Sequence, residues 1–267
     1  GQSAPHTHPY FSACPQVRAR MSVAQGYPHY GRGMSPPGRA ARSLAEDLRG
    51  RSDAELAALL LARPDLARPA PADLTALAAR ASTRASTQRA VESLNAGELQ
   101  VLEALAALGP GTTAKALSAA MGGADVRPAL AWLHELALVW DAEGGATVSR
   151  SALDVLGPYP AGLAPSLLST PGVAAGEPLW DDPALLETLV ADAPADATKV
   201  LASLTWGPPI GTLSRATGRT RGIRWLLDHG LLVSSGGDRV VLPRNVALAL
   251  RGGQTHMNPA IEPPELD

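Results

Sequence analysis

The chain has 267 residues and a formal net charge of −2, so no global field draws it to nucleic acid or to a membrane surface. Apolar residues make up 45% of the chain and aromatic residues only 4%, so its cores must be built from Leu, Ala and Val, which favours helices. The single cysteine, Cys14, excludes a disulfide within the chain, and no apolar run reaches the ~18 residues of a membrane span. We therefore expect a cytoplasmic protein with no membrane partner.

The first 94 residues divide into an arm and a helical segment. Residues 1–42 are rich in Pro, Gly, Ser and His and show no periodicity, which predicts a disordered basic arm. This arm can be read as a solvated tail or as a contact for phosphates. Residues 43–94 predict an N-terminal helical segment, in which Ser52 and Glu55 have the spacing of a capping box and Pro64 ends the helix that they open. Asp73 is expected to cap the next helix.

Residues 95–156 predict a compact unit. Asn95 and Glu98 again have capping-box spacing, and the helix that follows carries leucines at helical intervals. The remaining expected elements are a short helix opened by Thr112 or Thr113, a helix capped by Asp125, two strands around a turn at 141–145, and a closing helix at 151–156. A helix, a turn, a second helix and then a two-stranded hairpin is the order of a winged-helix unit, so we expect one here.

A second unit of the same kind is predicted at 195–252, after a connector with one helix at 157–194. Its centre is expected to hold a short helix from Thr212, a turn at Gly218 and a second helix opened by Thr220. Strands flanking a turn at 234–238 complete the same order. Trp132 and Trp225 occupy similar positions in the two units, which indicates a duplication. Residues 253–267 contain few apolar side chains, so we expect a disordered tail there.

The candidate functional residues are arginines of the second unit. In a winged helix, the second helix of the helix-turn-helix often enters the major groove of DNA, with flanking residues on phosphates. Arginine suits both contacts because its planar fork donates two parallel hydrogen bonds. Docking on a protein, or a solvated face, remains an alternative. The predicted DNA-binding residues are Arg215, Arg219, Arg221, Arg224, Arg239 and Arg244.

No pattern predicts catalysis or a cofactor. The chain contains no glycine loop that would cradle the phosphates of a nucleotide, and no Gly-x-Ser-x-Gly motif. Cys14 lies in the basic arm, and His134 and His229 lie late in two corresponding helices, where we expect no functional role. The helix of the first unit that corresponds to the arginine-bearing one carries only Arg127. We therefore expect no enzymatic activity, no metal and no cofactor, and we expect the first unit to serve packing or partner binding.

Several stretches resemble a known family. They are residues 43–48, 52–60, 63–66, 73–80, 94–102, 225–227 and 241–253. They are similar to the N-terminal part of helicase-associated proteins of high-GC bacteria, which carry an XPB-like helicase-associated domain. The resemblance implies a winged-helix protein linked to DNA helicases or to DNA repair, and it supplies no catalytic residue.

The expected fold is mainly α with small β-hairpins, made of two winged-helix units and an N-terminal helical segment. The expected function is a non-enzymatic, helicase-associated DNA-binding module that contacts DNA mainly through the second unit. A protein-interaction scaffold that docks on a helicase or another nucleic-acid machine is the first alternative. A transcription regulator is the second, although the chain has no long heptad run for dimerisation.

Overall fold

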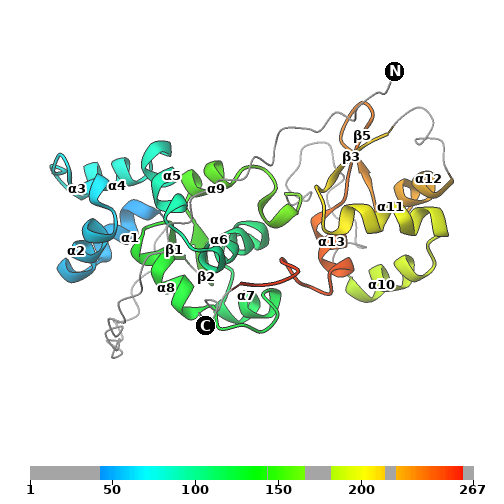
Figure 1. The fold of residues 1–267 in the computed structure, drawn as a ribbon, viewed down its shortest axis with the longest axis horizontal. Coiled ribbons are helices and arrows are strands. Elements are labelled where there is room, and N and C mark those ends of the chain that lie inside the picture. Colours follow the sequence, from blue (N-terminus) through cyan, green and yellow to red (C-terminus); the bar gives the residue numbers. More distant parts are fainter. Residues whose placement is uncertain (1–42, 143, 166–181, 214–220, 261–267) are drawn as a thin grey trace, which may run out of the picture. The chain divides into compact units, whose positions relative to one another are not determined.

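The computed structural model describes residues 43–142, 144–165, 182–213 and 221–260. These residues are mainly helical and carry two small antiparallel sheets (Figure 1). No helix in these ranges combines the length and the apolar character needed to cross a lipid bilayer. The predicted basic arm at 1–42 lies outside the described residues.

Five helices form the N-terminal segment. Ser52 and Glu55 make the predicted capping box, and the side chain of Asp73 accepts a hydrogen bond from the amide of Ala76. Pro64 ends one helix and begins the next one as its first residue, where its missing N–H costs nothing. The helices are α1 (Leu44–Gly50), α2 (Asp53–Ala62), α3 (Pro64–Ala67), α4 (Leu74–Ala81) and α5 (Arg84–Glu92).

The first predicted unit contains four helices and one hairpin. Asn95 and Glu98 form the second predicted capping box, and Thr113 caps the following helix. Asp125 is not the N-cap that we expected. Val126 holds that position, and Asp125 instead accepts a hydrogen bond from the amide of Arg127. The elements are α6 (Ala96–Leu108), α7 (Ala114–Ala120), α8 (Arg127–Glu135), β1 (Val139–Ala142), β2 (Gly145–Val148) and α9 (Arg150–Leu156).

The hairpin of this unit has a third, very short partner. Val139 pairs with Val148 in the β1–β2 ladder, and Thr112 forms an isolated antiparallel bridge with Ala146. Gly145 is required at the crossing, because a Cβ there would lie 2.4 Å from the carbonyl oxygen of Thr112.

The second predicted unit follows a 3₁₀ turn and one connecting helix. Here we expected a short helix from Thr212, and this was wrong: Thr212 ends strand β3, which pairs with β5. The rest of that expected helix and the turn at Gly218 lie outside the described residues. The elements are η1 (Pro160–Gly162), α10 (Pro183–Ala191), α11 (Ala195–Thr205), β3 (Ile210–Thr212), α12 (Arg221–Asp228), β4 (Val233–Ser234), β5 (Arg239–Val241) and α13 (Arg244–Leu250).

Each of these three parts has a buried apolar cluster. Leu48, Leu59 and Leu66 are centres of the N-terminal cluster, and the tryptophan ring of Trp140 packs against it. The other two clusters are built mainly from leucine, valine and alanine, as the low aromatic content requires. The second unit's cluster also contains Ala107, which belongs to α6 of the first unit.

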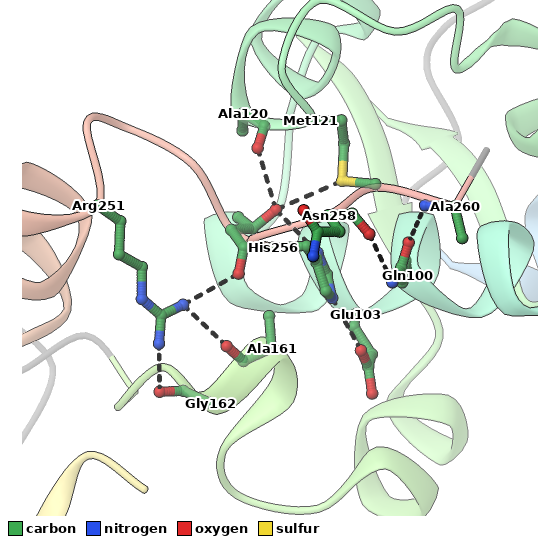
Figure 2. A network of polar contacts seen from close by, with 11 residues as sticks. Gln100, Glu103, Ala120, Met121, Ala161, Gly162, Arg251, His256, Asn258 and Ala260 are labelled. Carbon is green, nitrogen blue, oxygen red and sulfur yellow. Dashed lines mark hydrogen bonds and ion pairs between the residues drawn. The ribbon is translucent and has the colours of Figure 1, made fainter. Parts of the chain in front are cut away.

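The end of the chain contradicts the prediction of a disordered tail for the part that the structure describes. Residues 253–260 leave α13 and run along α6 and α7 (Figure 2). Thr255 is buried and its amide donates to the carbonyl of Ala120, while His256 Nε2 lies 3.0 Å from Glu103 Oε2. The side chain of Gln100 bonds the backbone at Asn258 and at Ala260. Polar contacts to two helices therefore help to hold this segment.

Candidate nucleic-acid interface

The predicted arginines divide into three groups in the structure. Arg215 and Arg219 lie outside the described residues. Arg221 and Arg224 are exposed on α12, and Arg239 is exposed at the start of β5. Arg244 is half-buried at the start of α13 and is considered separately below.

The orientation of α12 follows from its packing on α11, with which it lies side by side (Figure 1). Gly222, Ile223 and Leu226 are buried on one face of the helix. Residues three apart share a helix face, so the exposed Arg221 and Arg224 both lie on the opposite side. The arrangement therefore presents two cationic side chains to solvent from one helix.

The electrostatic surroundings of this pair are mixed. Among the described residues, neither Arg221 nor Arg224 forms an ion pair, and residues 214–220 include two arginines and no acidic residue. Acidic groups nearby in sequence are Asp228 at the end of α12 and Asp238 beside Arg239. A third carboxylate, that of Asp196, is already occupied by the amide of Gly222.

Arg239 projects from the hairpin that follows α12. It pairs with Thr212 across the β3–β5 ladder, and its carbonyl accepts a hydrogen bond from the amide of Ser235 that closes the turn. An arginine on such an exposed hairpin can reach a phosphate beside a groove-bound helix.

Arg244 has a structural partner. Its guanidinium donates to the carbonyl of Ala107 at the end of α6, and burial lowers the pKa of Arg244. This bond satisfies one of the carbonyls that a helix C-terminus leaves without an intrahelical donor. We therefore leave Arg244 out of the interface discussed below, although its role in DNA binding stays a prediction.

The corresponding helix of the first unit differs in charge. Arg127 forms two hydrogen bonds of 2.8 Å with the carboxylate of Asp125, and these bonds lower the pKa of Asp125 to about 2. The positive charge of Arg127 is therefore matched locally by a carboxylate. That the first unit is the weaker candidate for DNA contact stays a prediction.

The C-terminus of α8 is also covered by the N-terminal segment. Arg51 donates to the carbonyls of His134 and Glu135, and the buried Arg63 donates to the carbonyl of Leu136. His134 Nε2 lies 3.2 Å from Asp47 Oδ1, which also forms part of an ion pair with Arg51. Asp47 of α1 and the two arginines that directly follow α1 and α2 thus fix this helix end.

Arg251 has unusual surroundings that the sequence did not predict. It is 5% exposed, and its guanidinium donates to four backbone carbonyls, three of which are drawn in Figure 2. The same guanidinium lies over the ring of Trp206, 4.6 Å from the ring centroid. A lone arginine after an apolar helix gives no sequence signal for such a role, because its partners lie up to 90 residues away.

Comparisons with protein-family models, with curated proteins and with solved structures return no match. In the described ranges, no group of three or more His, Cys, Asp or Glu side chains is arranged to hold a metal ion.

Proposed function

We propose that the chain is a non-enzymatic DNA-binding module with two winged-helix units, and that it contacts DNA mainly through the second unit. The elements of the two units follow the same order. Each unit has a helix (α6 or α11), then a bridge or short strand, then at least one more helix (α7 and α8, or α12), and then a hairpin. The bridge at Thr112 in the first unit corresponds to strand β3 in the second. This shared order supports the winged-helix assignment.

The observation that carries the DNA proposal is the exposure of Arg221 and Arg224 on one face of α12, without an ion-pair partner among the described residues. Unpaired guanidinium groups keep their hydrogen-bond donors available for phosphates and for guanine edges. Arg239 adds a third cationic group on the adjacent hairpin. With a net charge of −2 on the whole chain, binding must depend on this local patch.

The link to a helicase or to DNA repair rests on the sequence resemblance alone. It leads us to propose that the partner DNA includes forked structures, on which helicases act. In this proposal a helicase motor, if one takes part, belongs to another protein or to another part of a longer chain.

Fluorescence anisotropy with duplex, single-stranded and forked DNA across a salt series tests the proposal. Each phosphate contact contributes about −0.9 to the slope of log K against log salt on duplex DNA, because condensed counterions are released. The double variant Arg221→Ala with Arg224→Ala should reduce the steepness of this slope by about 2 and weaken binding to every sequence. Adding Arg215→Ala and Arg219→Ala should extend the loss.

Arg127→Ala is the matched control, because it removes an exposed arginine from the corresponding helix of the first unit. Its charge is matched by Asp125, so binding should remain at the wild-type level. Equal binding by the wild-type protein and the double variant would contradict the proposal. The docking alternative would then gain weight, and exposed apolar residues such as Leu61 on α2 would be the first surface to test.

A further inference from the structure

Two exposed aromatic residues lie on segments that one buried arginine joins. Three of the tryptophans that the structure describes, Trp132, Trp140 and Trp225, are partly buried against the apolar clusters. In the described ranges the exposed aromatic residues are Tyr159 and Trp206, which are 36% and 38% exposed. With so few aromatic residues in the chain, the exposure of these two needs a reason.

Arg251 connects the backbone beside both rings. It donates to the carbonyl of Thr205, the residue before Trp206. It also donates to the carbonyls of Ala161 and Gly162 in the 3₁₀ turn η1, which directly follows Tyr159 (Figure 2). A fourth bond, to the carbonyl of Thr255, attaches the same guanidinium to the C-terminal segment. Hydrogen bonds from one guanidinium therefore join the segments that carry Tyr159 and Trp206.

The charge of Arg251 selects the class of ligand. All four of its partners are neutral carbonyls, and among the described residues it forms no ion pair, so one positive charge stays uncompensated beneath the indole of Trp206. The carboxylate of Glu103, which is drawn in the same network in Figure 2, is paired with His256. A ligand that combines flat rings with negative charge complements such a surface.

We propose that Tyr159 and Trp206 form a stacking platform for the unpaired bases of single-stranded nucleic acid, with Arg251 as the positioning residue behind Trp206. Bases stack on aromatic side chains with little regard to sequence, and a cation near the ring favours the phosphate chain. Choosing nucleic acid as the ligand rests on the proposed function. Tyr159, Trp206 and Arg251 all lie outside α12, so the platform proposal and the proposed α12 interface can be tested independently.

Titration of the full chain with oligothymidylate, followed by tryptophan fluorescence and by anisotropy, tests the platform. We expect quenching in the wild-type protein. Trp206→Phe should lose most of the quenching but keep most of the affinity, because a ring remains. Trp206→Leu and Tyr159→Leu should each weaken single-strand binding about tenfold, the typical effect of removing one stacking ring. Leu61→Ala removes an exposed apolar side chain elsewhere and should change nothing.

Duplex binding separates the two proposals. Loss of single-strand binding in Tyr159→Leu, with duplex binding intact, supports the platform. If Tyr159→Leu loses single-strand binding and the α12 arginine variant keeps duplex binding, the platform is supported and the α12 interface is contradicted. Circular dichroism shows whether Trp206→Leu folds, and Tyr159→Leu decides the question if it does not. Wild-type affinity for oligothymidylate in folded Tyr159→Leu, or quenching by a proline-rich peptide and not by the oligonucleotide, would overturn the inference.

Discussion

The carboxylate of Asp196 accepts a hydrogen bond of 2.6 Å from the backbone amide of Gly222. The bond joins the first turn of α11 to the first turn of α12, and it places a negative charge where a helix N-terminus favours one. Such a close approach is possible because residue 222 has no side chain. The position of the arginine-bearing helix therefore depends on one glycine.

Replacing that glycine should destabilise the second unit. A Cβ at position 222 would lie 2.5 Å from the backbone nitrogen of Ala197, so Gly222→Ala must push α12 away from α11. We expect a loss of about 1–3 kcal/mol in the free energy of unfolding, measured by urea denaturation. Gly50→Ala is the control, because nothing lies within 4 Å of the added carbon at the end of α1. It should be neutral or slightly stabilising, by up to about 1 kcal/mol. Equal stability of Gly222→Ala and Gly50→Ala would contradict the packing described here.

Arg63 should be important for stability although it is charged and buried. Its guanidinium donates to the carbonyls of Leu136 and Ala81 and to the hydroxyl of Ser86. Arg63→Met would leave the carbonyl of Leu136 and the hydroxyl of Ser86 without this donor in a region that water does not reach. The carbonyl of Ala81 would keep only its bond from the hydroxyl of Thr87, and we expect a total cost of about 3 kcal/mol. Thermal unfolding of Arg63→Met and of Arg49→Ala, which changes an exposed arginine on α1, measures the contrast. The Arg49 variant should stay within about 0.5 kcal/mol of wild type. A comparable small effect for Arg63 would show that its bonds add little.

Asp47 should make stability depend on pH in acid. Burial acts to raise the pKa of Asp47, but the hydrogen bond with His134 and the charge of Arg51 outweigh it, and the pKa lies below its usual 3.8. The unfolded chain therefore binds this proton more tightly than the folded protein does. The stabilisation is fully present above pH 3.8 and is lost as the pH falls from there through the lower pKa of the folded state.

Urea denaturation of the wild-type protein and of Asp47→Asn at several pH values checks this dependence. The stability difference between the two should be constant near neutral pH and should shrink below about pH 4. Asp154→Asn, at an exposed position of α9, provides a control whose difference from wild type should not change in this way. A difference for Asp47→Asn that grew with acidification would contradict the sign of the shift.

The C-terminal segment should stabilise α6 and α7. A chain that ends at Gly252 loses the buried Thr255, the pair between His256 and Glu103, and both bonds of Gln100. We expect its free energy of unfolding to fall by about 1–3 kcal/mol, which calorimetry would detect as a lower Tm. A chain that ends at Ala260 keeps all of these contacts and is the matched control. An unchanged Tm for the shorter chain would show that the segment contributes little.

Local signals made much of the helical fold predictable. The capping boxes at Ser52 and Asn95 and the cap at Asp73 depend on residues three positions apart, so the sequence alone reveals them. Strand β3 was missed because it exists through pairing with β5, whose partner residue for Thr212 is Arg239. The packed segment at 253–260 was missed for the same reason, since Thr255 finds its partner at Ala120.

The candidate site was predictable in part. Helical spacing separates the buried Ile223 and Leu226 from the exposed Arg221 and Arg224, so a periodicity argument suffices for that face. It fails for Arg244, because the attachment to Ala107 spans 137 residues and leaves no trace in the local pattern. An arginine that contacts a phosphate and one that bonds a helix end cannot be told apart by residue type.

Helix α6 takes part in two hydrophobic interiors at once. Most of its buried residues belong to the first unit, yet Ala107 lies within the apolar cluster of the second and its carbonyl receives Arg244. Cutting the chain in the connector would expose that alanine and leave the carbonyl without its donor. The connector predicted at 157–194 therefore does not separate two parts that unfold independently. We expect the two units to unfold together in a single cooperative transition.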